Sequence, residues 1–104
     1  MISIVTICYN ESKNIQKTIE SINNQSNKNY EHIIKDGLST DNTIEIVNKF
    51  KLANRKIFSY EDKGIYNAMN KGIKVSTGKY IGFLNCDDFY YKNSINILIF
   101  SIYV

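Results

Sequence analysis

Proline is absent from the sequence, and cysteine and histidine are scarce. The two cysteines, Cys8 and Cys86, lie far apart, form no CxxC pair and belong to no His/Cys cluster, which excludes the usual zinc sites. Such sparse, unpaired cysteines fit a protein of the reducing cytosol best. Lysine and arginine are scattered and never form a dense block, so the basic stripe of a nucleic-acid-binding protein is also excluded.

Hydrophobic runs long enough to cross a membrane are missing as well. A bilayer span needs about 20 apolar residues, whereas the apolar segment at residues 95–104 is shorter and contains Asn96 and Ser101. The N-terminal segment lacks the basic start of a signal peptide, so we expect a cytoplasmic protein. The formal net charge of +3 suits an anionic small molecule, or contact with an anionic membrane surface at the cytoplasmic face. An ordinary solvated surface explains most of the lysines.

Three familiar nucleotide-binding and catalytic motifs do not occur. GxGxxG and GxxxxGK[ST] are absent, which removes the main support for a dinucleotide-binding or P-loop protein, and there is no GxSxG nucleophile elbow. His32 stands alone among strand residues, so a structural place on a strand face is a better interpretation than catalysis. We interpret Cys86 as a small space-filling residue, because hard cations avoid thiolates.

What the sequence does contain is an alternation of short apolar segments and amphipathic helical patterns. Its 104 residues, 43% hydrophobic and 22% charged, fit one small domain, or part of a larger one, with a packed core. Strands are predicted at residues 2–8, around 32–34, at 56–60 and at 80–84. The resulting βαβαβαβ order predicts an α/β fold, in which a doubly wound, mostly parallel sheet has helices on both faces.

Three helices are predicted between these strands. The first is expected to begin near Ser12, the second to take its N-cap from Ser39, Thr40 or Asp41, and the third to close at Gly78 in a left-handed conformation. The apolar residues expected to face the sheet are Ile15, Ile19 and Ile22 in the first helix, Ile44, Val47 and Leu52 in the second, and Ile65, Met69 and Ile73 in the third.

Polar clusters follow all four predicted strands. They are Tyr9-Asn10-Glu11, Asp36, Glu61-Asp62, and the stretch from Asn85 to Asp88. In an open parallel sheet the carboxyl ends of the strands meet at one edge, and ligands bind there where the strand order reverses. Adjacent carboxylates resist joint ionisation unless a cation lies beside them, and Mg²⁺ or Mn²⁺ prefers such oxygen ligands. Asp87 and Asp88 therefore predict a metal site, with a solvated loop as the alternative.

Four longer segments occur in order along residues 2–90. They are SIVTICYNES at 3–12, EHIIKDGLSTDNT at 31–43, SYEDKGIYNAMNKGI at 59–73 and STGKYIGFLNCDD at 76–88. Through them the chain resembles the N-terminal half of an inverting family 2 glycosyltransferase, of the branch that builds bacterial surface polysaccharides. The resemblance implies a GT-A, Rossmann-like sheet over residues 1–104, incomplete at its C-terminus. It also implies sugar transfer from a nucleotide sugar, foremost a UDP-sugar, to a saccharide or lipid-linked acceptor.

The resemblance further implies roles for individual residues. Contacts to the nucleotide would come from Thr6, Tyr9, Asn10, Glu11, Asp36, Lys63, Asn70, Lys71 and Asp87. Tyr9 would lie close to the base, which suits an aromatic ring, and Asp87 would reach the ribose. Asp88 would hold Mn²⁺ or Mg²⁺, which would stabilise the departing nucleoside diphosphate as a Lewis acid.

The sequence departs from the family pattern in two places. Many relatives carry an acidic doublet after the second strand, where this chain has Lys35-Asp36-Gly37. The family's general base lies well beyond the metal motif, and no acidic catalytic motif follows Tyr91, so no catalytic residue is assigned and little transfer is expected from this chain alone. One alternative is a non-catalytic, nucleotide-binding remnant, which a second chain could complete. The other is a Mg²⁺-dependent phosphoryl-transfer domain. The latter would place its key carboxylate after the first strand, where Tyr9-Asn10-Glu11 stands.

Overall fold

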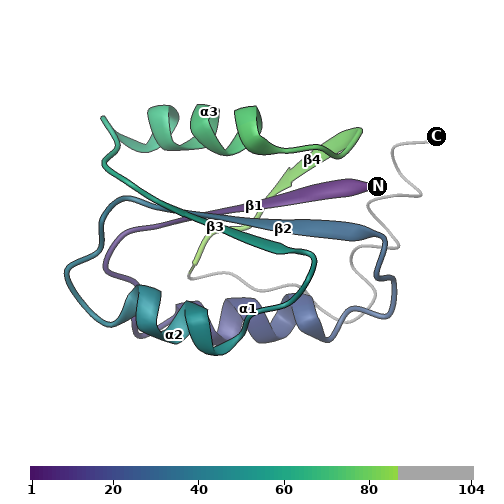
Figure 1. Ribbon diagram of the computed structural model, residues 1–104, viewed down its shortest axis with the longest axis horizontal. Coiled ribbons are helices and arrows are strands. Elements are labelled where there is room, and N and C mark those ends of the chain that lie inside the picture. Colours follow the sequence, from purple (N-terminus) through teal and green to yellow (C-terminus); the bar gives the residue numbers. More distant parts are fainter. Residues whose placement is uncertain (87–104) are drawn as a thin grey trace.

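The computed structural model describes residues 1–86 of the chain, and strands alternate with helices throughout (Figure 1). The elements are β1 (Ile2–Cys8), α1 (Ile15–Asn23), β2 (Tyr30–Asp36), α2 (Thr43–Lys49), β3 (Arg55–Ser59), α3 (Ile65–Val75) and β4 (Tyr80–Phe83). The predicted βαβαβαβ order is therefore confirmed.

The four strands form one sheet in the order β3-β2-β1-β4, and every neighbouring pair is parallel. From β1 the chain moves outward to β2 and β3, and then returns to place β4 on the other side of β1. Helices α1 and α2 cover one face of the sheet and α3 covers the other (Figure 1). This is the doubly wound arrangement that the sequence predicts, and its strand order reverses between β1 and β4.

The core lies mainly between the sheet and the α1–α2 layer. Ile15, Ile19 and Ile22 of α1 are completely buried, as their spacing predicts. They pack in two apolar clusters. One cluster contains Ile2, Ile4, Ile22, Tyr30 and Leu84, and the other contains Cys8, Ile15, Ile19, Ile34, Val47 and Cys86.

The predicted apolar face of α3 is wrong for Ile65 and Ile73, and Met69 is only partly buried. Ile65 is 61% exposed and Ile73 is 41% exposed, whereas Ala68 and Gly72 are buried. The reason is a close helix–sheet approach, because a Cβ atom on Gly72 would lie only 2.5 Å from Cγ1 of Val5 on β1. Small residues therefore face the sheet, and the larger isoleucines are turned away from it.

The helix boundaries also differ from the expectation. The first helix begins at Ile15, three residues after Ser12, with Asn14 as its N-cap. The second takes its N-cap from Asn42, although Asp41 accepts a hydrogen bond from the amide of Thr43 at 3.0 Å. The third ends in an extended Ser76, so it has no left-handed closure.

Two of the three residues that were expected in the core from the second helix are replaced by their neighbours. Leu52 is 45% exposed and Ile44 is only partly buried. Ile46 and Phe50 pack against the second apolar cluster beside Val47. The helix is shorter than the pattern suggested and ends at Lys49, so Leu52 lies outside its periodicity.

Within residues 1–86, no helix combines the length and the hydrophobicity that crossing a membrane requires.

Candidate functional site

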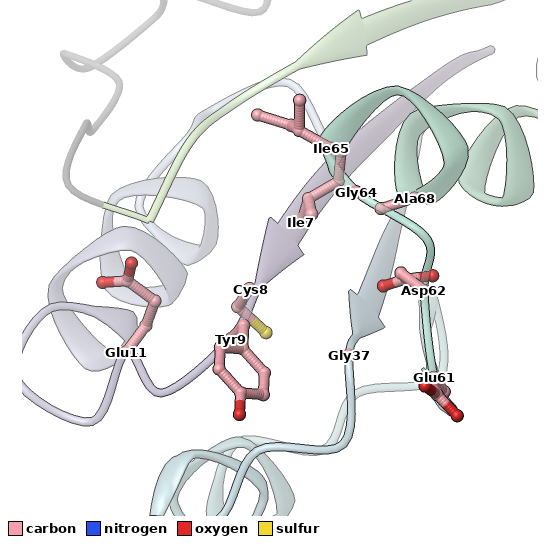
Figure 2. A pocket seen from close by; sticks show the side chains of 10 residues that line it. All are labelled: Ile7, Cys8, Tyr9, Glu11, Gly37, Glu61, Asp62, Gly64, Ile65 and Ala68. Carbon is pink, nitrogen blue, oxygen red and sulfur yellow. The ribbon is translucent and has the colours of Figure 1, made fainter.

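A pocket of about 520 Å³ opens at the carboxyl ends of β1, β2 and β3 (Figure 2). Its lining residues are Ile7, Cys8, Tyr9, Glu11, Gly37, Glu61, Asp62, Gly64, Ile65 and Ala68. They come from the ends of the strands, the loops that follow them, and the first turn of α3. This is the edge where the polar clusters were expected, and the volume suits a small-molecule ligand.

Gly37 makes room in the pocket between an aromatic ring and a carboxylate. A Cβ atom at this position would lie 3.1 Å from Oδ2 of Asp62 and 3.5 Å from Cδ1 of Tyr9. Tyr9 is 56% exposed, and Figure 2 shows its ring just beyond the end of β1. The pocket therefore offers a flat aromatic surface with hydrogen-bond acceptors beside it.

The loop that carries Tyr9 and Glu11 is hydrogen-bonded to the loop before α2 and to the first residue of that helix. Asn10 has a positive φ of 53°, and its Oδ1 accepts a hydrogen bond from the amide of Thr40 at 2.7 Å. The amide of Asn10 donates to Oγ of Ser39 at 2.8 Å, and the amide of Glu11 donates to Oγ1 of Thr43 at 2.9 Å. Asn10 thus shapes the loop, and it is not among the residues that line the pocket.

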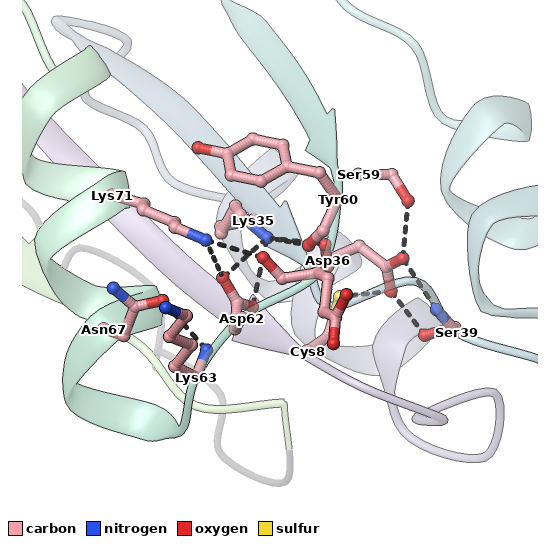
Figure 3. Close-up of polar contacts among 11 residues, drawn as sticks. Cys8, Lys35, Asp36, Ser39, Ser59, Tyr60, Asp62, Lys63, Asn67 and Lys71 are labelled. Atoms are coloured by element: carbon pink, nitrogen blue, oxygen red, sulfur yellow. Dashed lines mark hydrogen bonds and ion pairs between the residues drawn. The ribbon is translucent and has the colours of Figure 1, made fainter.

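Asp36 is a buried link between strands and does not line the pocket. Its side chain is fully buried and accepts hydrogen bonds from the amide of Ser39 at 3.0 Å and from Oγ of Ser59 at 2.8 Å. The hydroxyl of Ser39 and, at 3.6 Å, the thiol of Cys8 donate to its other oxygen (Figure 3). Both carboxylate oxygens are therefore occupied inside the protein.

Asp62 is the acidic residue of the pocket that has cationic partners. Its Oδ1 lies 3.0 Å from Nζ of Lys35 and 3.4 Å from Nζ of Lys71. Lys71 also donates to the carbonyl of Glu61 at 2.6 Å, and its ammonium lies 4.7 Å from the centre of the Tyr60 ring. Figure 3 shows both ammonium groups converging on Asp62. Lys71 therefore contacts a residue of the pocket wall without lining the pocket itself.

Thr6 belongs to a buried polar chain. It is completely buried, and its Oγ1 lies 2.8 Å from Nε2 of His32. Nε of Arg55 donates to Nδ1 of His32 at 2.9 Å, so we assign the His32 proton to Nε2, from which it is donated to Thr6. Burial and then the charge of Arg55 hold the pKa of His32 well below its usual range. The expected structural place of His32 on a strand face is confirmed.

The two cysteine thiols are both buried in the second apolar cluster. A hydrogen bond with Cys86, followed by burial, raises the pKa of Cys8 far above its usual range, so Cys8 stays a thiol. The thiol of Cys86 donates to the carbonyl of Ile7 at 3.3 Å. The structure thus fits the interpretation of Cys86 as a small space-filling residue.

Of the predicted site residues, the structure brings Tyr9 and Glu11 together in the pocket. Lys63 is exposed in the segment before α3, where its amide donates to Oδ1 of Asn67 at 2.9 Å, and Asn70 is exposed on that helix. Neither is among the lining residues, and neither are Thr6, Asn10, Asp36 and Lys71.

The metal prediction falls on a part of the chain that the structure leaves undescribed. Asp87 and Asp88 lie outside the described residues. Among residues 1–86, no three side chains of His, Cys, Asp or Glu are close enough together to hold a metal ion.

The sequence by itself predicts no role for Asp62, although this residue follows the third predicted strand. The signal was available, because Glu61-Asp62 follows a strand at the same edge as Tyr9. In the sequence, Lys35 and Gly37 stand out only as part of a departure from the family's acidic doublet.

The sequence profile described as Glycosyl transferase family 2 matches residues 3–103 of this chain. An Escherichia coli protein, UDP-Glc:alpha-D-GlcNAc-diphosphoundecaprenol beta-1,3-glucosyltransferase WfaP, is 37% identical over 99 residues, which are 92% of this chain and 39% of that protein. A PGL/p-HBAD biosynthesis glycosyltransferase of Mycobacterium bovis is 36% identical over 95 residues, which are 88% of this chain and 37% of that protein. The chain thus spans well under half the length of these relatives.

Solved structures share the same fold. S. aureus TarS 1-349 in complex with UDP-GlcNAc has a TM-score of 0.90 and 25% identity, and the match covers 97% of this chain and 30% of that one. The mannosyltransferase PcManGT from Pyrobaculum calidifontis, in complex with GDP-Man and Mn²⁺, has a TM-score of 0.82 and 20% identity, with 88% and 29% covered. The predicted GT-A, Rossmann-like α/β fold is confirmed.

Proposed function

Because the chain belongs to glycosyl transferase family 2, we propose that it carries the donor-nucleotide site of a glycosyltransferase. The observation that carries this proposal is the pocket at the carboxyl ends of β1, β2 and β3, with the ring of Tyr9 and the carboxylates of Glu11 and Asp62 in its lining. The reaction would move a sugar from a nucleoside diphosphate to an acceptor hydroxyl, with inversion at the anomeric carbon.

The pocket chemistry suits the nucleoside end of such a donor. The exposed ring of Tyr9 can stack on a flat base. Carboxylates accept hydrogen bonds but cannot donate them when ionised, so Glu11 and Asp62 match the N–H and O–H groups of a base and a ribose. They would repel a phosphate. The diphosphate is therefore expected to lie away from Asp62.

Asp87 and Asp88 are proposed for the diphosphate end. Adjacent carboxylates suit a hard divalent cation such as Mn²⁺ or Mg²⁺, and Asp88 would be its ligand while Asp87 reaches the ribose. When bound, this cation would stabilise negative charge on the departing nucleoside diphosphate. The base that activates the acceptor stays unassigned.

The donor and acceptor classes are proposed from the relatives. The E. coli relative is named as a transferase that uses UDP-Glc with a diphosphoundecaprenol-linked acceptor, and the S. aureus structure holds UDP-GlcNAc. We propose a UDP-sugar donor and a saccharide or lipid-linked acceptor. A lipid-linked acceptor would place the protein at the cytoplasmic face of a membrane.

A nucleotide-binding chain without transfer is the second candidate. The same pocket would then bind the nucleotide without transfer, and a complementing chain would supply the acceptor site. Donor binding is common to both candidates and can be tested first.

Tyr9→Ala is expected to weaken UDP binding about ten-fold, because one base–aromatic stack contributes about 1–3 kcal/mol. The measurement is calorimetric titration of the 104-residue chain with UDP in the presence of Mn²⁺. Tyr66→Ala is the matched control, since Tyr66 is 79% exposed and is not among the pocket-lining residues. Absence of UDP binding by the unaltered chain, or an equal loss in both variants, would count against the proposed donor site.

A further inference from the structure

The side chain of Lys35, on strand β2, is completely buried. A buried ammonium is costly unless its protons are paired. Lys35 is the residue before the last in β2, so it lies at the same edge of the sheet as the pocket. It is not itself among the lining residues.

Three acceptors satisfy the ammonium of Lys35. Its Nζ donates to the carbonyl of Asp36 at 2.7 Å, to the carbonyl of Tyr60 at 2.6 Å and to Oδ2 of Asp62 at 3.0 Å. The ammonium also lies 3.9 Å from the centre of the Tyr60 ring. Lys35 thereby joins the end of β2 to the segment after β3, and the two carbonyls fix where its charge lies.

The position of Asp62 follows from this arrangement. Its carboxylate is held on one side by Lys35 and lies on the other side against the space left by Gly37. Lys71 is a weaker partner, because it is 26% exposed and lies 3.4 Å away. Without Lys35, a carboxylate that is only 11% exposed would lose its buried cation and be free to turn into the pocket or toward solvent.

We propose that Lys35 is a positioning residue for the donor nucleotide, which holds the Asp62 carboxylate at the pocket wall in the orientation that accepts hydrogen bonds from the nucleoside. This inference rests on the proposed function, because it takes the ligand to be a nucleotide. It also gives a reason for the departure at Lys35-Asp36-Gly37. Asp36 is saturated by serine donors, and Lys35 instead orients a carboxylate from the segment after β3.

A role confined to stability makes a different prediction. If Lys35 only links β2 to β3, its loss lowers the melting temperature but leaves the affinity of the folded chain for UDP unchanged. If it acts through Asp62, its loss weakens UDP binding, and the effect disappears once Asp62 no longer carries a charge. A double-mutant cycle separates these two cases.

The experiment measures the dissociation constant of UDP, in the presence of Mn²⁺, for the 104-residue chain and for Lys35→Met, Asp62→Asn and the double variant. We expect each single variant to weaken binding about ten-fold, the size of effect that loss of one hydrogen bond to a charged group produces. The double variant should bind as Asp62→Asn does. Lys35→Arg, which keeps the cation, should stay closer to the unaltered chain than Lys35→Met.

Arg55→Met is the matched control. Arg55 is also a buried cation, only 7% exposed, but it begins β3 at the end of the sheet opposite the pocket, where it bonds His32, Phe50 and Asn23. Its loss should lower the melting temperature without changing the UDP dissociation constant.

Three results would overturn the inference. The first is an unchanged UDP affinity in Lys35→Met, and the second is that Lys35→Met weakens UDP binding equally in the unaltered chain and in Asp62→Asn. The third is a loss of UDP affinity in Arg55→Met as large as that in Lys35→Met. If the unaltered chain binds no UDP, the proposed function fails and the inference fails with it. Should Lys35→Met show no cooperative melt, the same cycle is run with Lys35→Gln, whose amide can still donate to the two carbonyls.

Discussion

Replacing Gly78 with alanine is expected to lower the free energy of unfolding by about 3 kcal/mol. A Cβ atom at this position would lie 2.6 Å from Oγ of Ser3, 2.7 Å from the backbone nitrogen of Ser3 and 3.0 Å from the carbonyl carbon of Ile2. The clash is with backbone of β1, which is held between β2 and β4 and cannot easily move. The added methyl group would also disturb the hydrogen bond from the Gly78 amide to Oγ of Ser3 at 2.8 Å.

Urea denaturation followed by circular dichroism measures this loss. Gly72→Ala is the matched control, because its Cβ atom would meet a side-chain methyl, Cγ1 of Val5, at 2.5 Å. Val5→Ala should therefore recover part of the stability lost in Gly72→Ala, whereas Ser3→Ala should not rescue Gly78→Ala. A Gly78→Ala chain as stable as the unaltered one would refute the close approach.

Glu31→Gln is expected to destabilise the chain by about 2 kcal/mol near neutral pH, because the carboxylate joins several donors. Oε2 accepts hydrogen bonds from the hydroxyl of Ser3, the hydroxyl of Thr77 and the amides of Thr77 and Gly78. Oε1 lies 3.1 Å from Nζ of Lys56. The neutral amide of glutamine keeps one acceptor oxygen and loses the charge, so it cannot satisfy all of these groups.

The same contacts make the effect depend on pH. Burial alone would raise the pKa of Glu31, but the hydrogen bonds from Ser3 and Thr77, together with Lys56, outweigh it and lower the pKa to about 2. Since the folded pKa lies below the ordinary value of 4.5, the stabilisation is present above pH 4.5 and is lost as the pH falls toward 2.

Melting curves between pH 2 and pH 7 test this expectation. The difference in stability between the unaltered chain and Glu31→Gln should be largest above pH 4.5 and should shrink toward zero near pH 2. Glu20→Gln, at an exposed position on α1, serves as the control and should follow the unaltered chain. A difference that stays constant over the whole range would show that the Glu31 charge is not what stabilises the fold.

The parts of the fold that local pattern determines could be predicted from the sequence. The bounds of β1 are those expected, and the three isoleucines of α1 face the core, because strand and helix periodicities act within a few residues. The face of α3 could not be predicted in this way. Ile65 and Ile73 satisfy a helical spacing, but contact with β1 selects the small residues Ala68 and Gly72, and that contact joins distant parts of the chain.

The candidate site could also be predicted only in part. Tyr9 and Glu11 could be predicted to lie near a ligand because they follow a buried strand at the sheet edge. The aspartate that faces the pocket could not be predicted. Asp36 is saturated by hydrogen bonds from Ser39 and Ser59, and Ser59 lies on another strand. Asp62 receives its buried cation from Lys35, a partner 27 residues away. Hydrogen-bond saturation is a property of the folded neighbourhood, and no spacing in the sequence reports it.

The central claim, that this chain binds a nucleoside diphosphate through a divalent cation, is tested most directly by thermal melting with UDP and Mn²⁺, each alone and together, beside Asp88→Asn. A ligand that binds only the folded chain raises the melting temperature, by the equivalent of about 2.7 kcal/mol at 100 times its dissociation constant. We predict a larger shift with both ligands than with either one, and loss of that extra shift in Asp88→Asn. A cooperative melt that UDP and Mn²⁺ together leave unmoved would contradict the account.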